Sequence, residues 1–166
     1  VNCHPALTEE HEAFRETVRR FVAREILPHA AAWDETGEFP RELYRKAAAA
    51  GLFGLGFPEA YGGFPADYFY RISSAEEFAL AGVGGLSASL FSHTIGAPPI
   101  AAVGSEALKR RVLPAILSGE KISALAITEP TGGSDVASLR TTARRDGGDY
   151  VVDGEKAFIT SGMRAD

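Results

Sequence analysis

The sequence has very little cysteine, methionine or tryptophan, with one residue of each among 166. A single cysteine, Cys3, excludes a disulfide within the chain and a zinc site built from cysteine pairs. This usage fits a reducing compartment. No apolar run reaches the roughly 18 residues that a membrane-spanning helix needs. The N-terminus lacks the basic start and apolar core of a secretory signal.

Basic charge is also in deficit, since 17 lysines and arginines face 22 aspartates and glutamates and give a net charge of −5. No basic stripe stands out, so nucleic acid is not indicated as a partner. The four histidines show no metal-ligand spacing, so no metal site is predicted. His93 lies in an apolar segment, which is more typical of a core or interface histidine than of a base. Phosphate-loop and Rossmann glycine motifs are missing, and no Ser-His-Asp set is readable.

The first part of the chain has the pattern of several helices whose starts and ends are marked by capping residues, prolines and glycines. Thr8 followed by two acids is a typical helix start, and the apolar stripe continues through Phe14, Val18 and Phe21. Proline and glycine separate the later helices, and Pro114 predicts a bend or a break in the last of them. The helices are expected at about residues 8–28, 40–51, 65–81, 86–95 and 105–117.

The sequence changes character after Lys121, where short apolar runs separated by glycine turns predict strands. A hairpin turn is expected at 146–149, and a second one, of the Asp-Gly type, at 152–156. Because a few strands with free edges are marginal alone, the sheet looks unfinished at Asp166 and the chain is expected to be a fragment. The strands are predicted at 122–128, 139–145, 150–152 and 157–160.

Two stretches could carry chemistry. Residues 125–135 read LAITEPTGGSD and residues 158–162 read FITSG, so each apolar run ends in a hydroxyl residue and a glycine turn. Two such stretches together could bind a flat polar ring system along their extended backbone. The turn at 131–134 could equally be a connection without a binding role. Glu129 is held extended by the following Pro130. Anchoring of the turn is favoured for Glu129 over a role facing a ligand.

Three motifs, in this order, resemble the acyl-CoA dehydrogenase family of flavoenzymes. They are PEAYGG at 58–63, AITEP at 126–130 with GSD at 133–135, and GEKAFITSG at 154–162. The resemblance covers almost the whole chain. It implies an α+β multidomain protein, with an all-α N-terminal bundle at 1–120 and the first strands of a β-barrel-like domain at 121–166. The family's C-terminal helical domain is absent from this chain.

The resemblance implies FAD as the cofactor. Thr128 would bond the pyrimidine edge of the isoalloxazine ring, Thr160 would bond near N5, and Phe158 would pack on the ring. Ser134 would also touch the acyl-CoA thioester or its pantetheine arm. Hydrogen bonds at these places stabilise charge arriving on the flavin. The cofactor-binding residues implied are Leu125, Ile127, Thr128, Gly133, Ser134, Phe158, Ile159 and Thr160.

The chain departs from the family pattern at three positions and by one absence. Phe158 replaces the commoner tryptophan, Thr131 stands for glycine and Ser161 for asparagine. The family's catalytic base is a glutamate of the C-terminal domain, so no catalytic residue is expected in this chain, and the fragment alone is expected to be inactive. Phe158 and the apolar segment 86–100 favour a substrate with a medium or long straight acyl chain.

The implied reaction is α,β-dehydrogenation of an acyl-CoA thioester to a trans-2-enoyl-CoA, with hydride transfer to flavin N5. Three partners are implied, namely acyl-CoA, an electron-transfer flavoprotein and further copies in a homotetramer or homodimer. The compartment would be the bacterial cytoplasm, or the mitochondrial matrix in a eukaryote. The alternatives are an acyl-CoA oxidase or flavin monooxygenase of the same superfamily, and a non-catalytic acyl-CoA-binding homologue.

Overall fold

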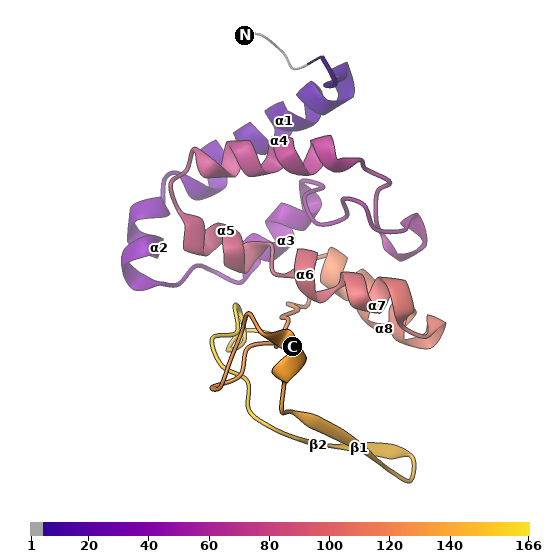
Figure 1. Cartoon of the computed structure of the whole chain (residues 1–166). Helices are drawn as coiled ribbons and strands as arrows, with labels where there is room; N and C mark the ends of the chain where they lie inside the picture. Colours follow the sequence, from indigo (N-terminus) through magenta and orange to yellow (C-terminus); the bar gives the residue numbers. More distant parts are fainter. Residues whose placement is uncertain (1–4) are drawn as a thin grey trace.

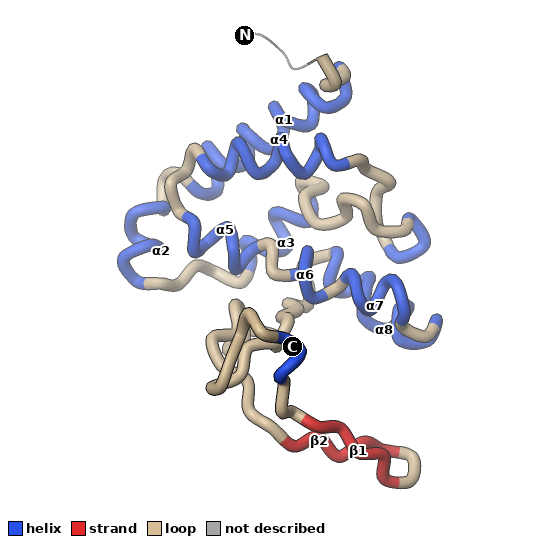
Figure 2. The backbone as a smooth tube through the Cα atoms, in the orientation of Figure 1, coloured by secondary structure: helices blue, strands red, loops and turns tan. Residues whose placement is uncertain are grey.

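The computed structural model describes residues 5–166, so Cys3, which carried the inference on compartment, lies outside the described residues. Helices form the upper part of the molecule, and residues from 122 onward form a lobe beneath them from which a hairpin projects (Figures 1 and 2). The predicted order of a helical unit followed by strands is confirmed. The elements are α1 (Glu9–Phe21), a π-helix (Val22–Ile26), α2 (Ala30–Thr36), α3 (Glu42–Ala49), a 3₁₀ turn (Glu59–Tyr61), α4 (Tyr68–Ala79), α5 (Gly84–Leu90), α6 (His93–Gly96), α7 (Pro98–Val103), α8 (Glu106–Leu117), a 3₁₀ turn (Val136–Ser138), β1 (Thr142–Asp146) and β2 (Asp149–Asp153).

Helix α1 begins where the sequence predicts. The Thr8 hydroxyl accepts the His11 backbone N–H, and the His11 side chain in turn bonds the Thr8 backbone N–H, which closes a capping box. Val18 and Phe21 of the predicted stripe are buried. The helix continues as a π-helical turn up to Ile26, so it ends just before Pro28, which cannot continue it.

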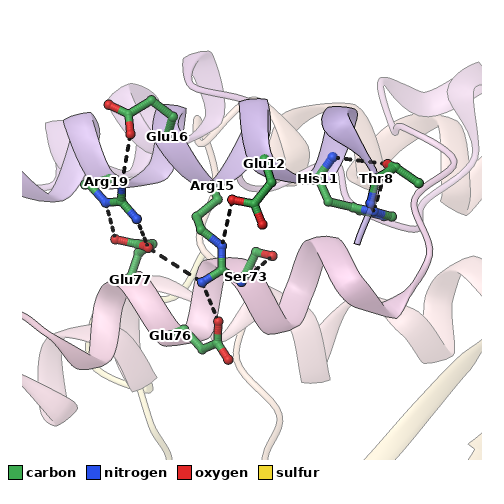
Figure 3. Close-up of polar contacts among 9 residues, drawn as sticks. All are labelled: Thr8, His11, Glu12, Arg15, Glu16, Arg19, Ser73, Glu76 and Glu77. Atoms are coloured by element: carbon green, nitrogen blue, oxygen red, sulfur yellow. Dashed lines mark hydrogen bonds and ion pairs between the residues drawn. The ribbon is translucent and has the colours of Figure 1, made fainter. Parts of the chain in front are cut away.

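Helix α1 packs along α4, and ion pairs join the two helices (Figure 3). Glu77 of α4 is buried, and its two carboxylate oxygens accept from Arg19 Nε at 3.1 Å and Arg19 Nη2 at 2.8 Å. Arg15 Nη1 lies 2.6 Å from Glu76 and 3.8 Å from Glu77. Opposite charges, such as those of Arg15 and Glu77, therefore hold α1 against α4 beside the apolar side chains that both helices bury.

The helical part holds two apolar cores. The first joins α1, α3, α4 and α5 through side chains such as Val18, Tyr44, Phe78 and Leu90. The second lies under α7 and α8, where Leu113 packs with apolar side chains of the 55–61 loop. Within residues 5–166, no helix is long and apolar enough to cross a membrane.

Two helices were not predicted, and the single helix predicted at 86–95 is divided into α5 and α6. Helix α2 buries none of its residues, so it leaves no apolar stripe in the sequence. Helix α7 carries Pro98 and Pro99 in its first turn, where a missing N–H costs nothing, so these prolines start a helix instead of separating two. Helix α8 runs through Pro114 without a break and ends three residues later.

The strand predictions are correct only in part. Strands β1 and β2 pair antiparallel, with Thr142 opposite Asp153 and Asp146 opposite Asp149, and the chain turns at Gly147 as expected. Residues 122–128 and 157–160 form no strand, and the predicted hairpin at 152–156 is wrong. The reason is that a strand needs a ladder of hydrogen bonds. The backbone N–H of Ala157 donates to the Thr128 carbonyl, at 2.9 Å, and no ladder extends from this bond within the described residues.

Candidate functional site

The two stretches singled out in the sequence lie side by side. The Ala157 N–H donates to the Thr128 carbonyl at 2.9 Å, and Lys156 Nζ donates to the Ile127 carbonyl at 2.9 Å. These bonds bring the segment that begins at Phe158 next to Thr128, although 29 residues separate Ile127 from Lys156. The two stretches therefore meet in the lower lobe (Figure 1).

Glu129 anchors this site, as the sequence favours. Its side chain is buried, and its carboxylate accepts from the Arg140 N–H at 2.7 Å, the Thr141 N–H at 2.9 Å, the Thr141 hydroxyl at 2.6 Å and Lys156 Nζ at 2.9 Å. These donors, the Thr141 hydroxyl first, lower the pKa of Glu129 to about 2. Its backbone closes the turn, because Glu129 and Gly132 exchange hydrogen bonds of 2.9 and 3.1 Å.

We expect Glu129→Gln to lower Tm by roughly 5 °C, because buried donors lose their charged acceptor. A carboxyl with a depressed folded-state pKa contributes stability above its unfolded pKa, 4.5, and this stability is lost as the pH falls toward 2. The variant should lack this acid-dependent loss. Thermal unfolding at a series of pH values checks both effects. Glu155→Gln, at an exposed position nearby, is the control and should shift Tm by less than about 1 °C; equal shifts in the two variants would refute the anchoring role.

Phe158 is the most unusual residue of the site. Its side chain is 94% exposed and its backbone has φ 56°, a left-handed conformation that is rare for a large residue. Ser161, with φ 62°, is the other non-glycine residue with a left-handed backbone within residues 5–166. The Ser161 hydroxyl lies 2.8 Å from the Ser89 hydroxyl of α5 and donates to the Ser89 carbonyl at 3.2 Å. The segment is thus fixed to the helical part while the Phe158 ring remains uncovered.

The hydroxyls predicted to bind a ligand are available. Within the described part of the chain, the side chains of Thr128, Ser134 and Thr160 form no hydrogen bond; Thr128 is half-buried and the other two are exposed. Gly133 leaves room at this point, because a Cβ there would lie 3.3 Å from the Thr128 hydroxyl and methyl group. The remaining predicted residues, Leu125, Ile127 and Ile159, are half-buried.

This arrangement fits a flat ring system with polar edges. An exposed aromatic ring offers a stacking face, and free hydroxyls on the same two stretches offer hydrogen bonds to polar edges. The isoalloxazine ring of FAD has both features, so the residues present fit this cofactor. Groups of three or more His, Cys, Asp or Glu side chains that could hold a metal do not occur within residues 5–166.

Comparison with known proteins decides the family. Residues 8–120 match the acyl-CoA dehydrogenase N-terminal domain, and residues 124–166 match the acyl-CoA dehydrogenase middle domain. The chain belongs to the acyl-CoA dehydrogenase family. The resemblance drawn from the three motifs is thereby confirmed.

The chain spans less than half the length of the relatives that it matches. The mitochondrial long-chain specific acyl-CoA dehydrogenase of Sus scrofa is 40% identical over 159 residues, which cover 96% of this chain and 37% of that protein. A Mycobacterium smegmatis protein assigned as an acyl-CoA dehydrogenase has a solved structure with 53% identity and a TM-score of 0.92, covering 96% of this chain and 42% of that one. Bacillus anthracis acyl-CoA dehydrogenase, solved with FAD, has 36% identity and a TM-score of 0.88 over 99% of this chain and 29% of that one.

A cavity of about 690 Å³ in the helical part was not predicted. It lies between α4, α5, α6 and the 52–55 segment, and its lining is largely apolar. Val83 borders this cavity and also a smaller one of about 320 Å³, which is lined by Ile159 and Ser161. Val83 therefore separates the larger cavity from the smaller one, in whose lining Ile159 and Ser161 flank Thr160.

Proposed function

We propose that these residues belong to an FAD-dependent dehydrogenase that converts an acyl-CoA thioester to a trans-2-enoyl-CoA. The observation that carries the proposal is the bond that joins Thr128 to the segment before Phe158 and Thr160, since the two stretches that meet there carry an uncovered ring and free hydroxyls. The FAD bound by the Bacillus anthracis relative supports the choice of cofactor. When bound, FAD would supply the acceptor for the hydride that leaves the β-carbon of the substrate.

The chain's own residues would bind and position. The Thr128 hydroxyl would bond the pyrimidine edge, the Thr160 hydroxyl would bond near N5, and the Phe158 ring would cover one face. Ser134 would contact the thioester or its pantetheine arm. Apolar side chains of Leu125, Ile127 and Ile159, with Gly133, would exclude water from the ring.

The remaining machinery is proposed to lie outside these residues. A glutamate beyond residue 166 would remove the α-proton, so no residue of this chain is assigned as catalytic. The helical part, 1–120, and the part from 121 onward would be separate domains of a homotetramer or homodimer. Electrons would pass to an electron-transfer flavoprotein, in the bacterial cytoplasm or the mitochondrial matrix.

The test is the full-length gene product. We expect a yellow protein that loses its colour when an acyl-CoA is added without oxygen. A colourless protein that takes up no FAD would refute the proposal. Rapid peroxide formation in air would favour an acyl-CoA oxidase instead.

The role of Phe158 can be tested separately. Phe158→Ala should raise the Kd for FAD about tenfold, because one face of the ring loses its aromatic cover. Tyr150→Ala removes another exposed aromatic ring, on β2, and should leave FAD binding unchanged. Titration of the apoprotein with FAD measures both variants. Equal losses in the two variants would contradict the assigned contact.

A further inference from the structure

The cavity of about 690 Å³ contains one charged side chain, Arg71, among its lining residues. The other side chains that line it are neutral, since burial lowers the pKa of His93 to about 4 and leaves its imidazole uncharged at neutral pH. Apolar side chains such as Leu52, Phe53 and Phe78 dominate the walls. An otherwise apolar cavity with a single cation selects for a ligand of matching character.

The lining positions of α4 show how the cavity is oriented. Arg71, Ala75 and Ala79 recur every four residues, so they lie along one side of the helix. At a rise of 1.5 Å per residue, Arg71 and Ala79 are about 12 Å apart along the axis. Val83, just beyond the end of α4, is the residue that also borders the smaller cavity beside Ile159. Arg71 therefore lies at the end of the cavity away from the candidate flavin site.

Arg71 has no carboxylate partner within the described residues. Its Nη2 donates to the Leu55 carbonyl at 2.8 Å, and its guanidinium carbon lies 5.7 Å from the centre of the Tyr68 ring. By contrast, Arg15 and Arg19 of α1 are each matched by glutamates of α4. The charge of Arg71 contributes to the lowered pKa of His93, so its field acts on the cavity wall. An unpaired cation beside apolar walls is costly until an anion neutralises it.

We propose that the cavity holds an acyl chain whose far end carries a carboxylate, and that Arg71 is the residue that selects this end group. The proposal rests on the proposed function, because the thioester end is placed near Thr160 and Ile159. Arg71 then lies where the opposite end of the chain arrives. The guanidinium keeps free N–H donors after bonding Leu55, and a carboxylate can accept two of them.

Binding of unreactive ligands tests this selection. The full-length gene product is titrated calorimetrically with pairs of S-alkyl-CoA thioethers, matched in chain length, that end in a methyl or a carboxylate group. These compounds lack the thioester carbonyl and cannot be dehydrogenated. We expect the carboxylate member of the best-fitting pair to bind about tenfold to hundredfold more tightly. Arg71→Met should remove this preference and leave the methyl ligand's affinity unchanged or improved, while Arg71→Lys should keep part of the preference.

The control is Arg24→Met, which removes an exposed arginine outside the cavity and should keep the preference. Equal binding of both ligands by the unaltered protein would overturn the proposal. Equal weakening of both ligands by Arg71→Met would assign Arg71 a structural role instead. If Arg71→Met does not fold, the unaltered protein and Arg71→Lys still decide between these outcomes. A protein without FAD or turnover would refute the proposed function, whereas the thioether preference remains measurable in it.

Discussion

Glu77→Gln should lower the free energy of unfolding by about 3 kcal/mol, because it removes the buried carboxylate that faces two arginines across the α1–α4 interface. Glu77 is 3% exposed and receives a two-bond contact from Arg19, and Arg15 lies 3.8 Å away (Figure 3). Arg15 is mostly buried and would lose part of its compensation. Chemical denaturation of the full-length gene product measures the loss.

Glu76→Gln is the matched control, at the neighbouring position of the same helix. Glu76 pairs with Arg15 at 2.6 Å, but its side chain is 54% exposed, so water replaces much of the lost interaction. The control should cost less than about 1 kcal/mol. Similar losses in the two variants would show that burial does not distinguish the two carboxylates.

The helices could be predicted where their buried face requires apolar residues at helical spacing in the sequence. Helix α1 has a capping residue, Thr8, and a buried stripe, and Ser105 caps α8 through a bond from the Leu108 N–H. Helix α2 has no fully buried residue and packs on the core only through the partly buried Ala30 and Trp33, so no periodic stripe marks it. Residues 122–128 have strand-like composition, but composition does not supply the neighbouring strand that completes a ladder.

The identity of the candidate site residues could be predicted from the sequence motifs, but their arrangement in space could not. The sequence indicates Thr128, Phe158 and Thr160, yet the bonds through Ala157 and Lys156 that bring their segments together are long-range. The role of Ser161 was missed because its contact, Ser89, lies 72 residues earlier on α5. The cavity was missed for the same reason, since its walls come from residues 52–94 and meet only through packing.

The stability of the helical part should fall by up to about 3 kcal/mol between pH 6.5 and pH 4 because of His93. Burial is the main cause of its low pKa, about 4; the charge of Arg71 adds to the effect, and the backbone carbonyls of Phe53 and Leu90 oppose it. The carbonyls compensate poorly, because neither ring nitrogen forms a hydrogen bond of good geometry. An unfolded histidine titrates near 6.5, so in this window the unfolded chain takes up a proton that the folded chain does not, and folding is penalised.

Above pH 6.5 the imidazole is neutral in both states and the penalty disappears. His93→Leu cannot titrate, so its stability should change much less between pH 6.5 and 4.5, a range that lies above the window in which Glu129 acts. Ser92→Ala is the control, because Ser92 is buried and unpartnered like its neighbour but carries no titrating group. Denaturant unfolding at several pH values should therefore give parallel curves for the control and the unaltered protein, and a flatter curve for His93→Leu. If all three curves fall together, another group carries the acid sensitivity, and the penalty assigned to His93 is wrong.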